Sequence, residues 1–271
     1  MRLAELFFLT EKDKMKHLAI GPGGLGYFAL LGAANRLHDD GHLKDVETLS
    51  GASAGALVVM MIAVNNFNFQ DIIHKSLTVP LSAFKINIKC LFESYGLVPR
   101  ETVRELVSTQ IPDLTFQQLY EIFPYKVHVA GYCVELSKTF YFSVDTNPEM
   151  SIIDATCISI SVPILFSSYK FGPWTYFDGG AIESVPCGHL IGKDSVLAIQ
   201  LTYKNTYYDD LSLPKYLIMI LNGIFSLRKT YTIPTLQIYI EDFNIANFNA
   251  SNTEKLQIFV EGYNKAEFIL T

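Results

Sequence analysis

The chain has 271 residues, 49% of them hydrophobic and 18% charged, which excludes the composition of a disordered protein and leaves ample material for a large apolar interior. Its formal net charge of −6 argues against nucleic acid as a partner, because binding a polyphosphate backbone requires a strong basic excess. No repeat or linker divides the chain, so we expect residues 1–271 to form a single domain.

The apolar segments are short. The longest uninterrupted ones, Ala56 to Val64 and Tyr216 to Leu221, fall well short of the roughly 20 residues that span a bilayer. The first residues, MRLAELFFLTEKDKMK, lack the long apolar core of a signal peptide. Four widely spaced cysteines in apolar surroundings predict reduced thiols: Cys90, Cys133, Cys157 and Cys187. We therefore expect an intracellular protein that is soluble or peripherally bound to a membrane, and the oligomeric state stays open.

The first third of the chain has an α/β rhythm. Residues 16–20 predict a short buried strand, and the glycine-rich turn 21–26 leads into an amphipathic helix. Residues 45–49 predict a second strand, followed by the tight turn 51–55 and an apolar helix through Val64. Two successive strand–turn–helix units predict an α/β fold whose mainly parallel sheet is covered on both faces, a three-layer α/β/α arrangement.

The middle of the chain has a different pattern. Residues 67–123 predict shorter amphipathic helices at 68–76, 99–110 and 115–122, joined by proline-containing loops, which together suggest a cap-like insertion. The later elements expected in chain order are strands at 125–135 and 138–143, a helix at 150–161, two short strands around Gly172-Pro173, a strand at 194–201 and a helix at 253–268.

The pentapeptide GASAG fits the G-x-S-x-G pattern and lies between a predicted strand and a predicted helix. Its glycines, Gly51 and Gly55, permit a sharp turn that exposes Ser53 at the start of the helix, where backbone N–H groups favour negative charge. Ser53 is therefore a candidate nucleophile. The alternative interpretation of the pentapeptide is a turn of small residues with a serine that caps the helix.

The segment GPGGLG also follows a strand and opens a helix, so its N–H groups form an anion-binding turn for a tetrahedral oxyanion or a phosphate. It fits the dinucleotide pattern G-x-G-x-x-G through Gly21, Gly23 and Gly26, and Glu47 follows at about the expected 20 residues. An oxidoreductase is thus an alternative. Two glycine-rich turns at adjacent strand ends suit a nucleophile that faces an oxyanion hole better than they suit a ribose site.

A nucleophilic serine needs a base, and two residues compete for this role. His189 occupies the last place in the order Ser, Asp, His that is typical of α/β-hydrolases. Asp178 ends a predicted strand before Gly179 and Gly180, which permits close approach to a neighbouring strand end, although Asp before two glycines also forms simple turns. No metal-binding motif is present, so we expect neither a metal ion nor another cofactor.

GPGGLG, GASAG and FDGG, in this order, resemble the motifs of patatin-like phospholipases. The resemblance extends to the segment from Asp154-Ala155 through Ser159 to Phe166, which lies ahead of FDGG. It also includes Asp242-Phe243 and the Gly262-Tyr263 pair near the end. It covers most of residues 16–268 and leaves the middle insertion as the variable part.

The resemblance implies a Ser-Asp dyad with Ser53 as the nucleophile and Asp178 as the general base. Gly21, Gly23 and Gly24 map onto the family's oxyanion loop. The N–H of Ala54 is a further donor that turn geometry suggests. The implied reaction is hydrolysis of carboxylic ester bonds through an acyl-enzyme, on a lipid substrate at a membrane or droplet surface.

Two residues depart from the family's pattern. Leu25 stands where the cytosolic phospholipase and patatin branches commonly carry Arg or Lys, and Pro22 replaces a small residue. The form Gly-x-Gly-x-Leu-Gly is similar to the branch that includes neutral-lipid lipases, which leaves the choice between phospholipid and neutral lipid open. A catalytically weak lipid-binding protein on the same scaffold is the remaining alternative.

Overall fold

The computed structural model describes residues 15–80, 84–203, 213–241 and 249–267. The beginning of the chain and the Asp242-Phe243 pair lie outside these ranges. All four cysteines lie within them and are free thiols. Within the described ranges, no helix has both the length and the apolar content needed to cross a bilayer.

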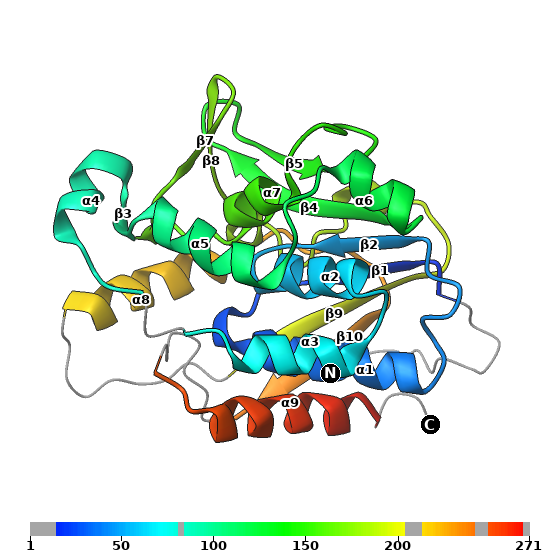
Figure 1. Cartoon of the computed structure of the whole chain (residues 1–271). Coiled ribbons are helices and arrows are strands. Elements are labelled where there is room, and N and C mark those ends of the chain that lie inside the picture. The colour runs from blue at the N-terminus through cyan, green and yellow to red at the C-terminus, as the bar shows by residue number, and fades with distance from the viewer. Residues whose placement is uncertain (1–14, 81–83, 204–212, 242–248, 268–271) are drawn as a thin grey trace.

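A central sheet organises the molecule (Figure 1). Its strand order is β10-β9-β1-β2-β4-β8-β7, with β5 paired to the remaining edge of β4. The first five of these strands are parallel, whereas β5, β7 and β8 run antiparallel to their partners. The strands are β1 (His17–Ile20), β2 (Thr48–Gly51), β4 (Lys126–Cys133), β5 (Lys138–Phe142), β7 (Tyr169–Phe171), β8 (Trp174–Asp178), β9 (Val196–Tyr203) and β10 (Thr235–Ile240). The expected α/β fold with a mainly parallel sheet is confirmed.

Helices pack on this sheet and enclose the main core. Helix α2 (Ala54–Val64) contacts β1, β2 and β4, and α7 (Ile152–Ser159) contacts β4 and β8. Helix α1 (Tyr27–Asp39) lies against β9 and β10 and is itself covered by α9 (Asn252–Glu267). The nine core residues of α2 are buried all round the helix, which explains its continuous apolar sequence.

A second, smaller cluster lies on the other side of β1 and β9. Ala19 and Ala198 face Val185, Cys187 and Leu190 there. These three residues belong to the segment that follows β8 and contains two 3₁₀ turns, η3 (Gly179–Ala181) and η4 (Gly188–Leu190). Because side chains alternate along a strand, β1 contributes to both clusters.

The region of the expected cap-like insertion contains α3 (Phe69–Leu77), α4 (Ile88–Ser94), β3 (Gly96–Val98), α5 (Arg100–Gln110) and α6 (Phe116–Ile122). Ile72, Val107 and Phe116 are buried in the main core, so α3, α5 and α6 are built into the body of the protein. Helix α4 differs, because none of its residues is buried. A cap function for residues 67–123 stays a prediction.

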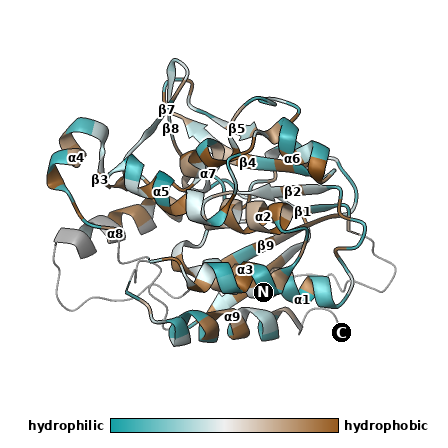
Figure 2. Ribbon diagram, in the orientation of Figure 1, coloured by the Kyte–Doolittle hydropathy of each residue, from teal (hydrophilic) through white to brown (hydrophobic). Residues whose placement is uncertain are grey.

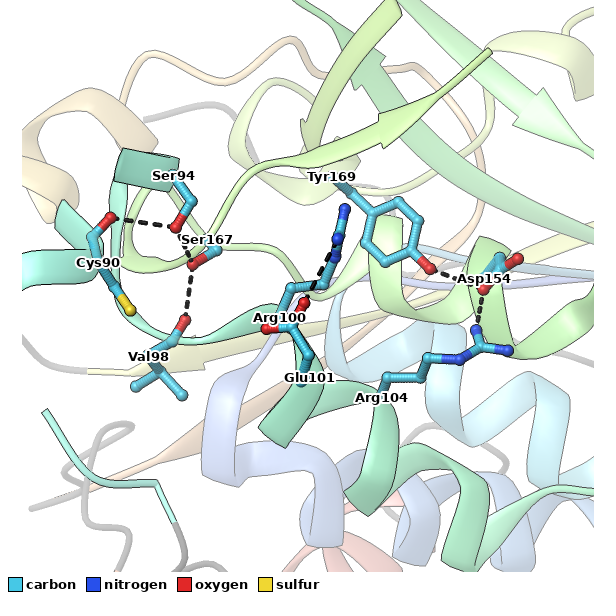
Figure 3. A network of polar contacts seen from close by, with 9 residues as sticks. All are labelled: Cys90, Ser94, Val98, Arg100, Glu101, Arg104, Asp154, Ser167 and Tyr169. Atoms are coloured by element: carbon cyan, nitrogen blue, oxygen red, sulfur yellow. Dashed lines mark hydrogen bonds and ion pairs between the residues drawn. The ribbon is translucent and has the colours of Figure 1, made fainter. Parts of the chain in front are cut away.

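Polar contacts join α4, β3 and α5 to the segment after β6 and to α7 (Figure 3). The hydroxyls of Ser94 and Ser167 lie 2.8 Å apart, and Ser167 donates to the carbonyl of Val98 at 3.0 Å. Strand β3 pairs with β6 (Ile164–Phe166) in parallel. Arg104, one helical turn after the start of α5, forms an ion pair with Asp154 of α7. The remaining helix, α8 (Leu213–Phe225), precedes β10.

Candidate active site

Ser53 lies in the sharp turn between β2 and α2, as the GASAG pattern predicts. Its backbone has φ 55° and ψ −128°, a conformation that side chains other than glycine rarely adopt. The backbone N–H of Ser53 donates to Oγ of Ser159 on α7 at 3.0 Å, which fixes the turn against a neighbouring helix. Ser53 is buried with 6% of its surface exposed, so this strained turn holds its side chain inside the protein.

Strand β4 brings Asp178 to the turn that holds Ser53. Val129 of β4 pairs with Gly51 on one edge and with Phe142 on the other, whereas Gly131 pairs with Asp178 and Phe140. Strands β2 and β8 therefore follow one another along the same edge of β4. Since Ser53 is two residues beyond Gly51, and Gly131 is two residues beyond Val129, the serine and the aspartate meet at the same level of the sheet.

Asp178 is buried, and several groups around it interact with its carboxylate. The N–H of Gly180 donates to its Oδ1 at 2.7 Å, and the Ser53 side chain lies near enough to stabilise its ionised form. Burial raises the pKa of Asp178 to about 6. The Ser53 side chain, the N–H of Gly180 and the positive charge of Arg228 oppose this rise, because each stabilises the ionised carboxylate. The result is a carboxyl that changes its charge close to neutral pH.

The glycine-rich loop contacts both other motifs. A Cβ added to Gly180 would lie 2.7 Å from Cβ of Pro22, so the proline ring packs directly on the turn after Asp178. A Cβ added to Gly55 would lie 2.1 Å from the carbonyl oxygen of Ile20, which only glycine permits. The three segments GPGGLG, GASAG and FDGG thus meet at the carboxyl ends of their strands.

Backbone N–H groups of two segments are available at this meeting point. Among the described residues, the N–H groups of Gly23, Gly24 and Ala54 have no hydrogen-bond acceptor. Gly21 differs from them, because its N–H donates to the carbonyl of Ile199 at 2.9 Å and extends the β1–β9 pairing. Gly21 was expected to be an oxyanion donor, but its N–H group is already engaged in this hydrogen bond of the sheet.

Residues 18–191 match the family described as patatin-like phospholipase, which is well over half of the chain. The chain belongs to this family. The resemblance inferred from the three motifs is therefore confirmed, and the family supports lipid hydrolysis as the class of activity.

Two viral proteins and a solved bacterial structure are similar to this patatin-like chain at low sequence identity. A protein of Invertebrate iridescent virus 6 named probable lipid hydrolase 463L is 23% identical, and the match covers 97% of this chain and 91% of the relative. An uncharacterized protein of Acanthamoeba polyphaga mimivirus, R571, is also 23% identical, over 74% of this chain and 69% of the relative. The crystal structure of VipD from Legionella pneumophila matches 95% of this chain and 67% of its own with a TM-score of 0.59 at 16% identity, which shows a shared fold.

His189, the competing base of the patatin-like chain, belongs to a different polar cluster. Its ring stacks on His128 of β4 and contacts the ring of Tyr141 of β5 at a tilt of 46°, with ring centroids 4.3 Å apart in both pairs. Neither ring nitrogen has a hydrogen-bond partner among the described residues. Burial lowers the pKa of His189 to about 3 and that of His128 to about 4, so both rings are neutral near pH 7.

The position of Glu47 argues against a dinucleotide-binding site. It precedes β2, whereas the loop 21–26 follows β1. His17 pairs with Thr48 in the parallel register of these strands, so Glu47 lies at the opposite end of the sheet from the loop. Its carboxylate forms an exposed ion pair with Lys16 at 2.8 Å. A ribose bound at the loop would therefore be out of reach of Glu47, and the alternative of a dinucleotide-binding oxidoreductase loses its acidic partner.

Three polar residues at the site had no assigned role in the sequence interpretation. Ser159 accepts the N–H of Ser53, and the carbonyl of Ser161 accepts the N–H of Asp178 at 3.0 Å. Arg228 lies far along the chain and acts on Asp178 through its charge. The two serines lie in the segment that resembles the family's D-A-x-x-A-S pattern, which was the available signal. Within the described ranges, no group of His, Cys, Asp or Glu side chains has the arrangement of a metal site.

Proposed function

We propose that the protein is a serine acyl hydrolase that cleaves carboxylic ester bonds of lipids with a Ser53–Asp178 dyad. The observation that carries the proposal is the approach of the Ser53 side chain to the buried Asp178 carboxylate, whose ionised form it stabilises. Two features support it further: the strained turn at Ser53 and the meeting of three glycine-rich segments around the pair.

In the first half-reaction, Oγ of Ser53 attacks the ester carbonyl carbon while its proton passes to the Asp178 carboxylate. The C=O electron pair moves to the carbonyl oxygen and forms a tetrahedral oxyanion. As this intermediate collapses, the bond to the leaving alcohol breaks and Asp178 gives its proton to the alcohol oxygen. The products are a free alcohol and an acyl chain esterified to Ser53.

The oxyanion needs donors that are not already committed to the protein. The N–H groups of Gly23, Gly24 and Ala54 are our candidates, and Gly21 is left out because its N–H donates to Ile199. Ala54 is the first residue of α2, where the helix dipole also favours negative charge. Removal of one such donor typically slows a reaction by about 10²–10³-fold.

Water completes the cycle. Asp178, again ionised, accepts a proton from a water molecule that attacks the acyl carbonyl. The second tetrahedral intermediate expels Oγ of Ser53, which regains its proton from Asp178, and the fatty acid leaves. A pKa of about 6 for Asp178 suits both directions of proton transfer, because the group is ionised at neutral pH and still basic enough to accept a proton.

The lipid as substrate is supported by the family and by the name of the viral relative, probable lipid hydrolase. Leu25 is buried in the main core, so the glycine-rich loop presents no charged side chain to a headgroup at this position. We therefore do not restrict the proposal to phospholipids. Pro22 packs against Gly180, so the family departure at this position is accommodated within the site.

A fluorophosphonate probe tests the proposal directly, because it reacts with an activated serine without needing the natural lipid. We expect a stoichiometric adduct on the peptide that contains Ser53, detected by mass spectrometry, and none in Ser53→Ala. An inactive lipid-binding protein would give neither the adduct nor release of fatty acid from a lipid panel. That outcome in folded protein would refute the proposed function.

A further inference from the structure

Helix α8 carries apolar side chains on its solvent-exposed side. Tyr216, Met219, Ile220 and Ile224 recur at helical spacing and are all exposed. Leu227, in the turn after the helix, is 85% exposed. Leu221 lies on another side of the helix and is buried. An amphipathic helix normally faces its apolar stripe inward, so this orientation needs a partner outside the molecule.

Helix α4 also carries exposed apolar side chains. Ile88 and Phe92 are one helical turn apart, and Tyr95 follows at the helix end. Phe92 is 80% exposed, and Ile86, just before the helix, is exposed as well. In Figure 1 both α4 and α8 lie at the left end of the molecule, and Figure 2 shows apolar residues on each. We call the exposed apolar residues of 86–95 and 216–227 the apolar end.

Both helices are fixed to segments that flank Asp178. Helix α4 is held by the Ser94–Ser167 contact and by the β3–β6 pairing, and β6 follows Ser161, whose carbonyl accepts the N–H of Asp178. The turn after α8 is held by Lys229, whose N–H donates to the carbonyl of Ile182 at 2.8 Å. A partner bound at the apolar end would therefore lie close to the proposed catalytic pair.

The charge of these segments differs from that of the whole chain. Residues 84–95 and 213–230 contain five cationic residues and one acidic residue, in a protein whose formal net charge is −6. Of the cations, Lys85, Lys89 and Lys229 are exposed, whereas Arg228 acts on Asp178; the acid, Glu93, is exposed. Exposed apolar stripes combined with local positive charge are the pattern of a helix that lies in an anionic membrane interface.

We propose that the apolar end docks on an anionic phospholipid bilayer and so brings the Ser53 site to its substrate. This inference rests on the proposed function for its purpose, but the docking itself does not require catalysis. Among the described residues, Phe92 and Leu227 are the most exposed large apolar ones; they insert among the acyl chains, and Lys85, Lys89 and Lys229 meet the lipid headgroups.

Binding to vesicles tests the proposal, with Ser53→Ala as the parent so that no lipid is consumed. The probes are vesicles of phosphatidylcholine alone and of phosphatidylcholine with phosphatidylserine. We expect binding mainly to the anionic vesicles, and the added pair Phe92→Gln with Leu227→Gln lowers the partition coefficient by about tenfold or more. A matched control replaces Leu256 and Val260, which are exposed on α9, with Gln and leaves binding unchanged.

Three outcomes would overturn docking: no binding of the parent, equal loss in the α9 control, or binding untouched by the Phe92–Leu227 pair. A parent that forms dimers, which the pair dissolves, without binding vesicles would assign the apolar end to a second copy of the chain. Failure of the proposed function is seen separately. The enzyme with Ser53 intact would then fail to cleave a water-soluble short-chain ester, whatever its vesicle binding.

Discussion

Two buried polar clusters lie along the same strand, β4, and they have opposite properties. Asp178 pairs with Gly131, accepts a hydrogen bond from the N–H of Gly180, and has its ionised form stabilised by the Ser53 side chain. His128 stacks on His189, whose ring nitrogens have no hydrogen-bond partner among the described residues. Burial raises the pKa of Asp178 to about 6 and lowers that of His189 to about 3. Burial alone therefore does not produce a general base. Asp178 can act as one near neutral pH because the groups around it stabilise its ionised form.

The largest expected effect comes from removing either member of the dyad. We expect Ser53→Ala and Asp178→Asn each to lower ester turnover by about 10⁴-fold, because nucleophile and base act in the same steps. The double variant should have no lower turnover than either single variant. Fatty-acid release from phospholipid, lysophospholipid and triacylglycerol panels measures this. Substantial turnover by Asp178→Asn would show that another base serves Ser53.

The sequence predicted the elements around Ser53 well, for a local reason. The apolar run of 56–64 and the glycines of GASAG determine a buried helix and a sharp turn without distant partners. The predicted strand at 45–49 was displaced, since β2 comprises Thr48–Gly51. Strand β10 was not anticipated, because its sequence TLQIYI alternates between buried and exposed residues and its place depends on pairing with β9.

The contact between Ser53 and Asp178 was not visible in local patterns. It follows from the register of β4 with β2 and β8, three strands separated by long stretches of chain. Only the family resemblance linked the two residues beforehand. The hydrogen bond that occupies the N–H of Gly21 likewise depends on β9, so the motif alone could not separate this glycine from Gly23 and Gly24.

The second prediction concerns pH. Asp178 must be ionised to accept the proton of Ser53, so kcat/KM should be half-maximal near pH 6, level off above about pH 7 and fall about tenfold per pH unit below about pH 5. Because the charge of Arg228 lowers the pKa of Asp178, Arg228→Met should move the inflection to higher pH. His189→Phe should leave it in place. The measurement is a pH profile with an uncharged ester, and an inflection that moves with His189 would contradict the assignment.

The third prediction is that replacing Asp178 with Asn makes the folded protein relatively more stable at neutral pH than at acidic pH. Since the pKa of Asp178 is raised from 3.8 to about 6 by folding, its favourable contribution is complete below pH 3.8 and is lost as pH rises through 6. Asn cannot ionise. The free energy of unfolding of Asp178→Asn, relative to the native protein, should therefore increase by about 2 kcal/mol between pH 4 and pH 7. Urea unfolding at both pH values measures it, and a difference independent of pH would contradict it.

The smallest effect is expected in the histidine cluster. A phenyl ring at position 189 keeps the ring contacts with His128 and Tyr141 and removes two ring nitrogens that have no hydrogen-bond partner among the described residues. His189→Phe should thus leave turnover within about threefold of native and stability unchanged or about 1 kcal/mol higher. His189→Ala, which leaves a gap, serves as the control and should lose stability but keep its specific activity. Loss of turnover in folded His189→Phe as complete as in Ser53→Ala would place a histidine in the proton relay, and the dyad would be wrong.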